Sequence, residues 1–228
     1  MDLSFLPELL AAVLATVIAI TLHEAAHGYA ALSLGDDTAE RMGRLSINPL
    51  RHVDMVGTVL VPGLLLVSQL ATTGRVDMMF GWAKPVPVDI RRLRDPRSGM
   101  MWVAAAGPAT NFLLAFVAAL LLHVAGLVGS EWLFRFLGFS ILANLVLGLF
   151  NLFPVPPLDG GRIVVGLLPL RAALAWARME RFGLLIVIGV LFLLPMALPS
   201  FQPMDWFISG IIRPAFDFVL QAAGHGPG

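Results

Sequence analysis

The chain consists of long apolar runs separated by short polar or proline-containing segments. The runs occupy residues 5–34, 55–71, 100–128, 132–153 and 182–198. Because about 20 apolar residues form a helix that crosses a bilayer, this pattern predicts a membrane protein with several spans. The run at 55–71 is short and is broken by Pro62-Gly63, which favours a re-entrant element over a crossing. Residues 204–222 mix aromatic and charged side chains, which is typical of an amphipathic helix at the membrane surface.

The composition strengthens this interpretation. Hydrophobic residues make up 58% of the 228 residues and charged residues 13%, against roughly 25% charged residues in soluble domains. The formal net charge is zero, so no bulk field attracts nucleic acid and no nucleic-acid partner is expected. The chain has no cysteine, which excludes disulfides, a thiol nucleophile and thiolate metal sites. A metal site in this chain must use His, Asp or Glu.

The basic residues are distributed unevenly and predict an orientation. Of the 15 Lys and Arg residues, nine lie between residues 35 and 99 and four between residues 154 and 181. Only Arg135 and Arg213 lie elsewhere. Since basic loops stay in the cytoplasm, both segments are predicted to be cytoplasmic, with the N-terminus outside and no net crossing at 55–71.

Two histidines and a glutamate lie deep in the first run, where an ionisable group costs about 2.5–3.5 kcal/mol. Residues 23–27 read His-Glu-Ala-Ala-His. On a helix, His23 and His27 share one face at about 5–6 Å, a spacing that lets two imidazoles bind one Zn²⁺. Glu24 lies about 100° round the helix, where it can reach a metal-bound water and act as general base. The alternative is a pair of buried histidines satisfied by neighbouring side chains.

A catalytic zinc needs a third protein ligand. His52 lies in a basic loop, as a loop residue or a substrate contact, and His123 and His225 are predicted to be far from His27. Asp159 is the best remaining ligand, because a proline-rich segment precedes it and two glycines follow it at the same predicted side of the membrane. The alternative for Asp159 is the N-cap of the next helix.

Two motifs together resemble the site-2 protease family of intramembrane zinc metalloproteases. They are the His-Glu-Ala-Ala-His of residues 23–27 and the Asn-Leu-Phe-Pro-Val-Pro-Pro-Leu-Asp-Gly of residues 151–160. Residues 106–111, Ala-Gly-Pro-Ala-Thr-Asn, are similar to the family's Gly-Pro-x-x-Asn element, and residues 81–88 look like the short β-hairpin or re-entrant loop of its compact bacterial members. The expected fold is therefore an all-α polytopic membrane protein with about four transmembrane helices, a re-entrant element and a short β-hairpin on the cytoplasmic side.

The resemblance implies roles for individual residues. His23, His27 and Asp159 would bind one catalytic Zn²⁺, and Glu24 would be the catalytic base. Asn151 would orient the substrate or stabilise the oxyanion, although a helix-packing hydrogen bond is the alternative. Asn111 and the Gly107-Pro108 pair are expected to serve close helix packing.

The implied activity is that of an intramembrane zinc endopeptidase of the cell membrane, cleaving a transmembrane protein or peptide and opening toward the cytoplasm. Residues 1–228 are expected to form one membrane-embedded metalloprotease domain, with a core at 5–165 and an accessory helix and interfacial tail at 166–228. An extended edge near residues 80–89 is expected to hold the unwound substrate by β-augmentation. A metal transporter and an inactive scaffold are the competing classes. The outer halves of the spans lack the polar residues that transport requires, and the intact His-Glu-x-x-His disfavours a scaffold. The substrate, the triggering signal and the oligomeric state stay open.

Overall fold

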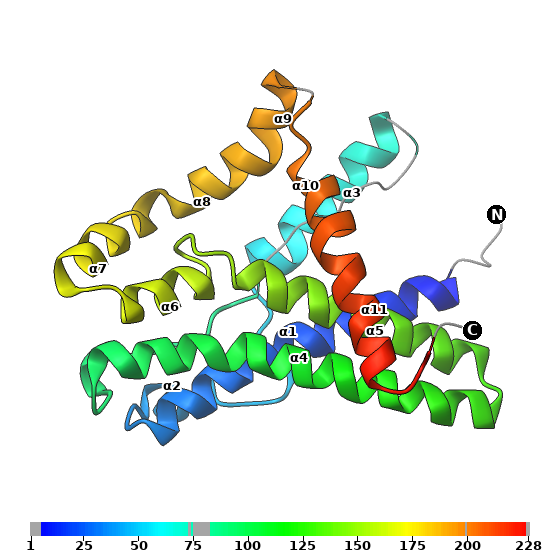
Figure 1. Ribbon diagram of the computed structural model, residues 1–228, viewed down its shortest axis with the longest axis horizontal. Helices are drawn as coiled ribbons and strands as arrows, with labels where there is room; N and C mark the ends of the chain where they lie inside the picture. The colour runs from blue at the N-terminus through cyan, green and yellow to red at the C-terminus, as the bar shows by residue number, and fades with distance from the viewer. Residues whose placement is uncertain (1–5, 73, 75–82, 199, 227–228) are drawn as a thin grey trace.

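Three long helices form the centre of the molecule. The computed structural model describes residues 6–72, 74, 83–198 and 200–226. Within it, α1 (Leu6–Ser33), α4 (Pro96–Val128) and α5 (Glu131–Asn151) pack side by side (Figure 1). The start of α4 is tied to the end of α1, because the Arg94 amide donates to the Leu34 carbonyl at 3.0 Å. A tight turn at Gly129 then returns the chain along α4 as α5.

The ends of these helices follow from local chemistry. Asp95 caps α4 by accepting hydrogen bonds from the Arg97 and Ser98 amides, which satisfies backbone donors that the first turn leaves free. At the other end Gly129 takes the left-handed conformation with φ of 69°, which costs a glycine little. Ser130 then caps α5 through the Leu133 amide. All three helices lie within four residues of the apolar runs that predicted them.

All three central helices are long and apolar enough to cross a membrane. A fourth crossing is possible if Leu170–Gly183 and Leu185–Ala197, which bend by 65°, form one broken span. The chain is therefore an all-helical membrane protein with three or four candidate spans among the described residues. The helices of this second half are α6 (Asp159–Leu167), α7 (Leu170–Ala177), α8 (Glu180–Ile188), η4 (Gly189–Leu193) and α9 (Leu194–Ala197).

The segment after α1 leaves the bundle and returns to the loop that it left. It contains α2 (Thr38–Arg41), η1 (Pro49–Arg51), η2 (Met55–Leu60) and α3 (Val61–Thr72). The excursion that includes η2 and α3 begins after His52 and ends at Lys84, whose amide donates to the His52 carbonyl at 2.8 Å. A re-entrant element requires this return, so the predicted re-entrant interpretation of 55–71 is geometrically possible.

The expected β-hairpin is not found among the described residues. Residues 75–82 lie outside them, and residues 83–89 form neither strand nor helix. Pro85 and Pro87 remove two donors, while the amides of Lys84, Val86 and Asp89 bond to a loop carbonyl and to two carboxylates of the protein itself. This 83–89 segment therefore has few donors left for strand pairing, which also limits it as a β-augmentation edge for a substrate.

Asp36, just after α1, anchors the 83–89 segment. Asp36 is 1% exposed, and its carboxylate accepts hydrogen bonds from the Asp89 amide at 2.7 Å and from the Thr38 amide and hydroxyl. Burial raises the pKa of Asp36, but the hydrogen bonds from Thr38 and Asp89 outweigh it, so the pKa lies below its ordinary value. The ionised form of Asp36 thus fixes this segment against the end of α1. A short helix, η3 (Ile90–Arg92), then leads into α4.

The C-terminal helices pack on the bundle. They are α10 (Pro203–Phe207), η5 (Ile208–Ile212) and α11 (Arg213–Ala222), and α11 crosses α4 and α5 (Figure 1). Ala223 belongs to the buried cluster of those two helices, together with Ile141 and Leu145. Beyond α11, the His225 ring stacks on His123 with ring centroids 3.9 Å apart. His123 and His225 therefore fasten the tail to α4, and their ring nitrogens bond to the Ala223 and Ala119 carbonyls.

Candidate metal centre

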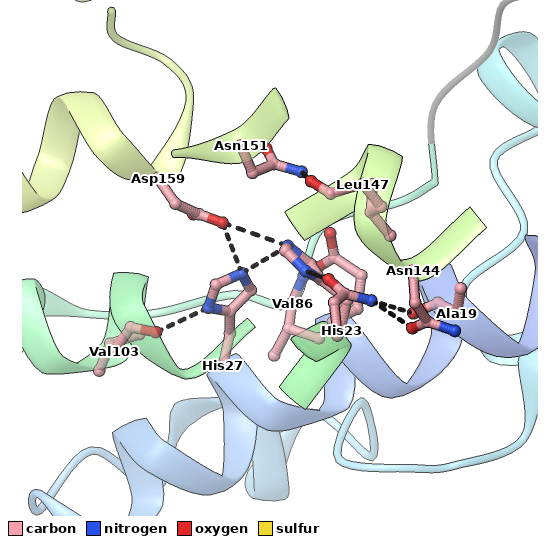
Figure 2. A network of polar contacts seen from close by, with 11 residues as sticks. Ala19, His23, His27, Val86, Val103, Asn144, Leu147, Asn151 and Asp159 are labelled. Carbon is pink, nitrogen blue, oxygen red and sulfur yellow. Dashed lines mark hydrogen bonds and ion pairs between the residues drawn. The ribbon is translucent and has the colours of Figure 1, made fainter. Parts of the chain in front are cut away.

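Three metal-ligating side chains from two distant parts of the chain meet inside the bundle. His23 and His27 lie one turn apart on α1, and their Nε2 atoms are 3.0 Å apart. The Asp159 Oδ2 lies 3.2 Å from the His23 Nε2 and 3.3 Å from the His27 Nε2. Figure 2 shows the carboxylate and both rings turned toward one another. His23 and Asp159 are buried, and the His27 side chain is 12% exposed.

Hydrogen bonds at the far side of each ring direct both Nε2 atoms inward. The Nδ1 atom of His23 lies 2.6 Å from the Asn111 Oδ1, and that of His27 lies 2.7 Å from the Val103 carbonyl oxygen. A carbonyl oxygen can only accept, so the neutral His27 ring must carry its proton on Nδ1 and its lone pair on Nε2. Outer partners of this kind commonly orient metal-binding histidines.

A glycine of α4 makes room for both rings. A Cβ on Gly107 would lie 2.6 Å from the Cε1 atoms of His23 and His27 and from the His27 Nε2. Only a glycine lets the α4 backbone lie this close to the imidazoles. The sequence predicted close packing at Gly107, and the partners in this structure are the two candidate ligands.

The loop before Asp159 folds back over the first turn of α6. A Cβ on Gly160 would lie 2.2 Å from the Leu152 carbonyl oxygen, and one on Gly161 would lie 2.3 Å from the Pro156 nitrogen. These two glycines therefore let the backbone reverse tightly beside the carboxylate. The N-cap position of α6 is Leu158, so the alternative of Asp159 as the N-cap does not describe this structure.

The donor set fits a divalent cation. Four ligands placed tetrahedrally at about 2.0–2.1 Å from Zn²⁺ are separated from one another by about 3.3 Å, close to the three separations between the Nε2 and Oδ2 atoms. The buried Asp159 Oδ2 also has no hydrogen-bond donor among the described residues. Two imidazole lone pairs and one carboxylate oxygen directed at a common point are a set that a cation would satisfy.

Glu24 is fixed beside this cluster by the 83–89 segment. Its Oε2 accepts a hydrogen bond from the Val86 amide at 3.0 Å. The Val86 side chain is buried, and a Cβ on Gly28 would lie 3.0 Å from its Cγ1. Val86 thus packs against α1 one turn after Glu24, and this packing directs its amide at the Glu24 carboxylate.

Asn151 and His52 have local partners. The Asn151 side chain donates to the Leu147 carbonyl at 3.0 Å, one turn earlier in α5, and Figure 2 shows its amide turned toward Leu147. The oxyanion role of Asn151 thus stays a prediction. His52 is 2% exposed and its Nε2 lies 2.7 Å from the Ser46 carbonyl oxygen, which agrees with its interpretation as a loop residue.

Two buried asparagines behind His23 were not assigned to the site from the sequence. Asn111 was expected to serve helix packing, and Asn144 of α5 was not singled out. The Asn111 Nδ2 donates to the Asn144 Oδ1 at 2.8 Å, and the two side chains are 0% and 3% exposed. An uncharged amide in the middle of an apolar run indicates a buried polar contact, but the sequence does not show which residue it contacts.

An apolar cavity of about 620 Å³ lies against the loop that carries Asp159. Phe153 and Leu158 of this loop line it together with Val190 of η4 and Phe207 of α10, and the Phe153 and Phe207 ring centroids lie 5.6 Å apart. The loop that supplies the candidate carboxylate ligand therefore also forms a wall of this cavity.

Comparison with known proteins identifies the family of this chain. Residues 125–194 match the profile of Peptidase family M50. The chain is 38% identical to "Putative zinc metalloprotease YwhC" of Bacillus subtilis over 89% of this chain and 87% of that protein. It is 28% identical to "Putative zinc metalloprotease Rip2" of Mycolicibacterium smegmatis over 98% of this chain and 82% of that protein. No solved structure matches. The extent of the match to YwhC shows that the chain belongs to peptidase family M50, the site-2 protease family.

Proposed function

We propose that this membrane metalloprotease is an intramembrane zinc endopeptidase that hydrolyses peptide bonds in or near the transmembrane segments of membrane proteins. The observation that carries the proposal is the cluster of His23, His27 and Asp159, whose ligand atoms all lie within 4.8 Å of one another. The cluster lies among helices long enough to span a bilayer. A peptide bond that reaches it must therefore come from within or close to the membrane.

In this proposal the three side chains hold one Zn²⁺. When bound, the ion lowers the pKa of water and polarises the scissile carbonyl. Glu24 takes the proton from the attacking water and delivers it to the leaving amine. The Val86 amide holds the Glu24 carboxylate in place for both transfers. Asn151 supplies a carboxamide N–H to the oxyanion, which requires its side chain to turn away from Leu147.

The substrate class follows from the surroundings of the cluster. A helical segment hides its amides in its own hydrogen bonds, so it has to unwind locally before a carbonyl can reach the site. The apolar cavity beside the Asp159 loop is lined almost entirely by hydrophobic side chains. We place the apolar side chains of the substrate's membrane segment there, next to the loop that carries Asp159.

We place the site toward the cytoplasm. His27 lies six residues before the end of α1, about 9 Å from that end at 1.5 Å per residue. The basic residues of the loops after α1 and before α4 gather at this same end, among them Arg41 and Arg92, which both pair with Asp37. Since basic loops remain in the cytoplasm, the end of α1 nearest the site is the cytoplasmic end.

The test is cleavage of a reporter single-span protein by the purified chain in phospholipid vesicles. Glu24→Gln should retain zinc and lose cleavage, whereas the control Glu40→Gln on α2 should keep both. His23→Ala and Asp159→Ala should lose zinc and cleavage together. Cleavage by Glu24→Gln at the wild-type rate would refute the assignment of the base. A zinc content unchanged in Asp159→Ala would refute the third ligand.

A further inference from the structure

The polar side chains behind His23 form a continuous row that ends at backbone carbonyls. The Asn144 Nδ2 donates to the Ser140 carbonyl at 2.8 Å, one turn earlier in α5. The Asn144 Oδ1 accepts from the Asn111 Nδ2 at 2.8 Å, and this Nδ2 also approaches the Ala19 carbonyl at 3.4 Å. Figure 2 shows the row running from the rings of the cluster toward Asn144 and Ala19.

These fixed ends decide which way both amides point. The Ser140 carbonyl can only accept, so Asn144 must present its NH₂ group to it and its oxygen to Asn111. Asn111 must then present its own NH₂ group to Asn144 and to the Ala19 carbonyl. Only the Asn111 oxygen remains to face His23, and an oxygen accepts. The proton of the neutral His23 ring is therefore required on Nδ1, and the lone pair on Nε2.

We infer that Asn111 and Asn144 are positioning residues that fix His23 in the tautomer able to bind the metal. The inference rests on the proposed function for its biological meaning, because the tautomer matters only if His23 is a ligand. Asn144 contacts none of the three candidate ligands and acts through Asn111. For His27 the same task is done by the Val103 carbonyl alone, which cannot rotate and cannot donate.

The two histidines therefore respond differently to mutation. Removing the Asn144 side-chain oxygen leaves the Asn111 NH₂ group with only its long 3.4 Å contact to the Ala19 carbonyl, so that the amide can rotate by 180° and offer its NH₂ group to His23. His23 would then carry its proton on Nε2, which blocks the metal-binding atom. His27 keeps its tautomer in every such variant, because its partner belongs to the α4 backbone. This provides an internal control within a single sample.

The experiment is ¹⁵N NMR of the metal-free protein labelled with ¹⁵N-histidine, at a pH above the titration of the imidazoles. The His23 signals are assigned by their loss in His23→Gln. Wild type should show the Nδ1–H form at both His23 and His27. Asn144→Leu should add an Nε2–H population at His23 only and weaken zinc binding about 10- to 100-fold in a chelator competition. Asn144→Asp should keep the wild-type pattern, because a carboxyl oxygen accepts from the Asn111 NH₂ group as the Asn144 Oδ1 does.

An Nε2–H form of His23 in the wild-type protein overturns the proposal without any variant. So does an Asn144→Leu protein whose His23 tautomer and zinc affinity are unchanged. If Asn144→Leu does not fold, Asn144→Ala is the second variant and the same two readings apply. The tautomer is read without metal or substrate. If the wild-type protein has the expected tautomer but does not cleave, only the proposed function is refuted. If the protein is active but carries Nε2–H at His23, only this inference is refuted.

Discussion

Gly107→Ala should remove metal binding while leaving the helical bundle folded. The added methyl carbon would lie 2.6 Å from three imidazole atoms, about 0.8 Å short of the 3.4 Å at which ordinary contact begins. Metal–ligand distances in proteins hold to about 0.2 Å, so rings displaced by several times that amount no longer converge on one ion. Overpacking of a core costs about 1–3 kcal/mol. The better helix propensity of alanine offsets up to about 1 kcal/mol of this destabilisation.

The measurement is zinc per chain in detergent-purified protein, with circular dichroism and thermal unfolding on the same samples. Gly126→Ala is the matched control, because it lies in the same helix and nothing lies within 4 Å of its added Cβ. Gly126→Ala should bind zinc as wild type does, and Gly107→Ala should bind little despite unchanged helicity. Wild-type zinc stoichiometry in Gly107→Ala would refute the close approach of α4 to the two rings.

Four further predictions follow from the same geometry. Removing zinc with a chelator should lower the stability of the fold and abolish cleavage. Adding zinc at 100 times its dissociation constant should raise the free energy of unfolding by about 2.7 kcal/mol, measured as a rise in Tm. An unchanged Tm would argue against a preformed metal site. The lowered pKa of Asp36 means that its ionised form stabilises the fold above its ordinary value of 3.8 and that this contribution is lost as the pH falls through the folded-state pKa. The Tm difference between wild type and Asp36→Asn should accordingly shrink on acidification below about pH 4, and a gap that widens would contradict this. Gly160→Ala should unfold the Asp159 loop, because its Cβ would lie 2.2 Å from the Leu152 carbonyl oxygen; limited proteolysis would show new cleavage there. Because the chain has no cysteine, Glu40→Cys and Glu131→Cys report topology cleanly, and an impermeant thiol reagent added to whole cells should label only Glu131→Cys.

The spans and the candidate ligands could be predicted because their signals are local. An apolar run defines a membrane helix, and the i, i+4 spacing places His23 and His27 on one face without knowledge of the rest of the fold. Asp159 could be paired with them because it is an ionisable group beside a proline-broken span. All three are made conspicuous by the cost of placing polar groups in an apolar segment.

The supporting contacts could not be predicted, because each joins residues that are far apart in sequence. Asn111 lies 88 residues from His23, and nothing near either residue names the other. Asn144 is identifiable as a buried amide but not as the partner of Asn111. Residues 81–88 suggested a hairpin through their resemblance to an element of the family's compact bacterial members. The amides of the 83–89 segment bond instead to Glu24, Asp36 and a loop carbonyl, whose positions only the tertiary structure fixes.

The hydrogen bond from the Val86 amide to Glu24 determines which inactive variant can hold an uncleaved substrate. Glutamine at position 24 keeps a carbonyl oxygen to accept from the Val86 amide, so the 83–89 segment can stay in place around a bound substrate. Alanine at that position has no acceptor and would release the segment from α1. The two inactive proteins should then differ as traps. Glu24→Gln should hold its substrate long enough for crosslinking or imaging, whereas Glu24→Ala should let it escape.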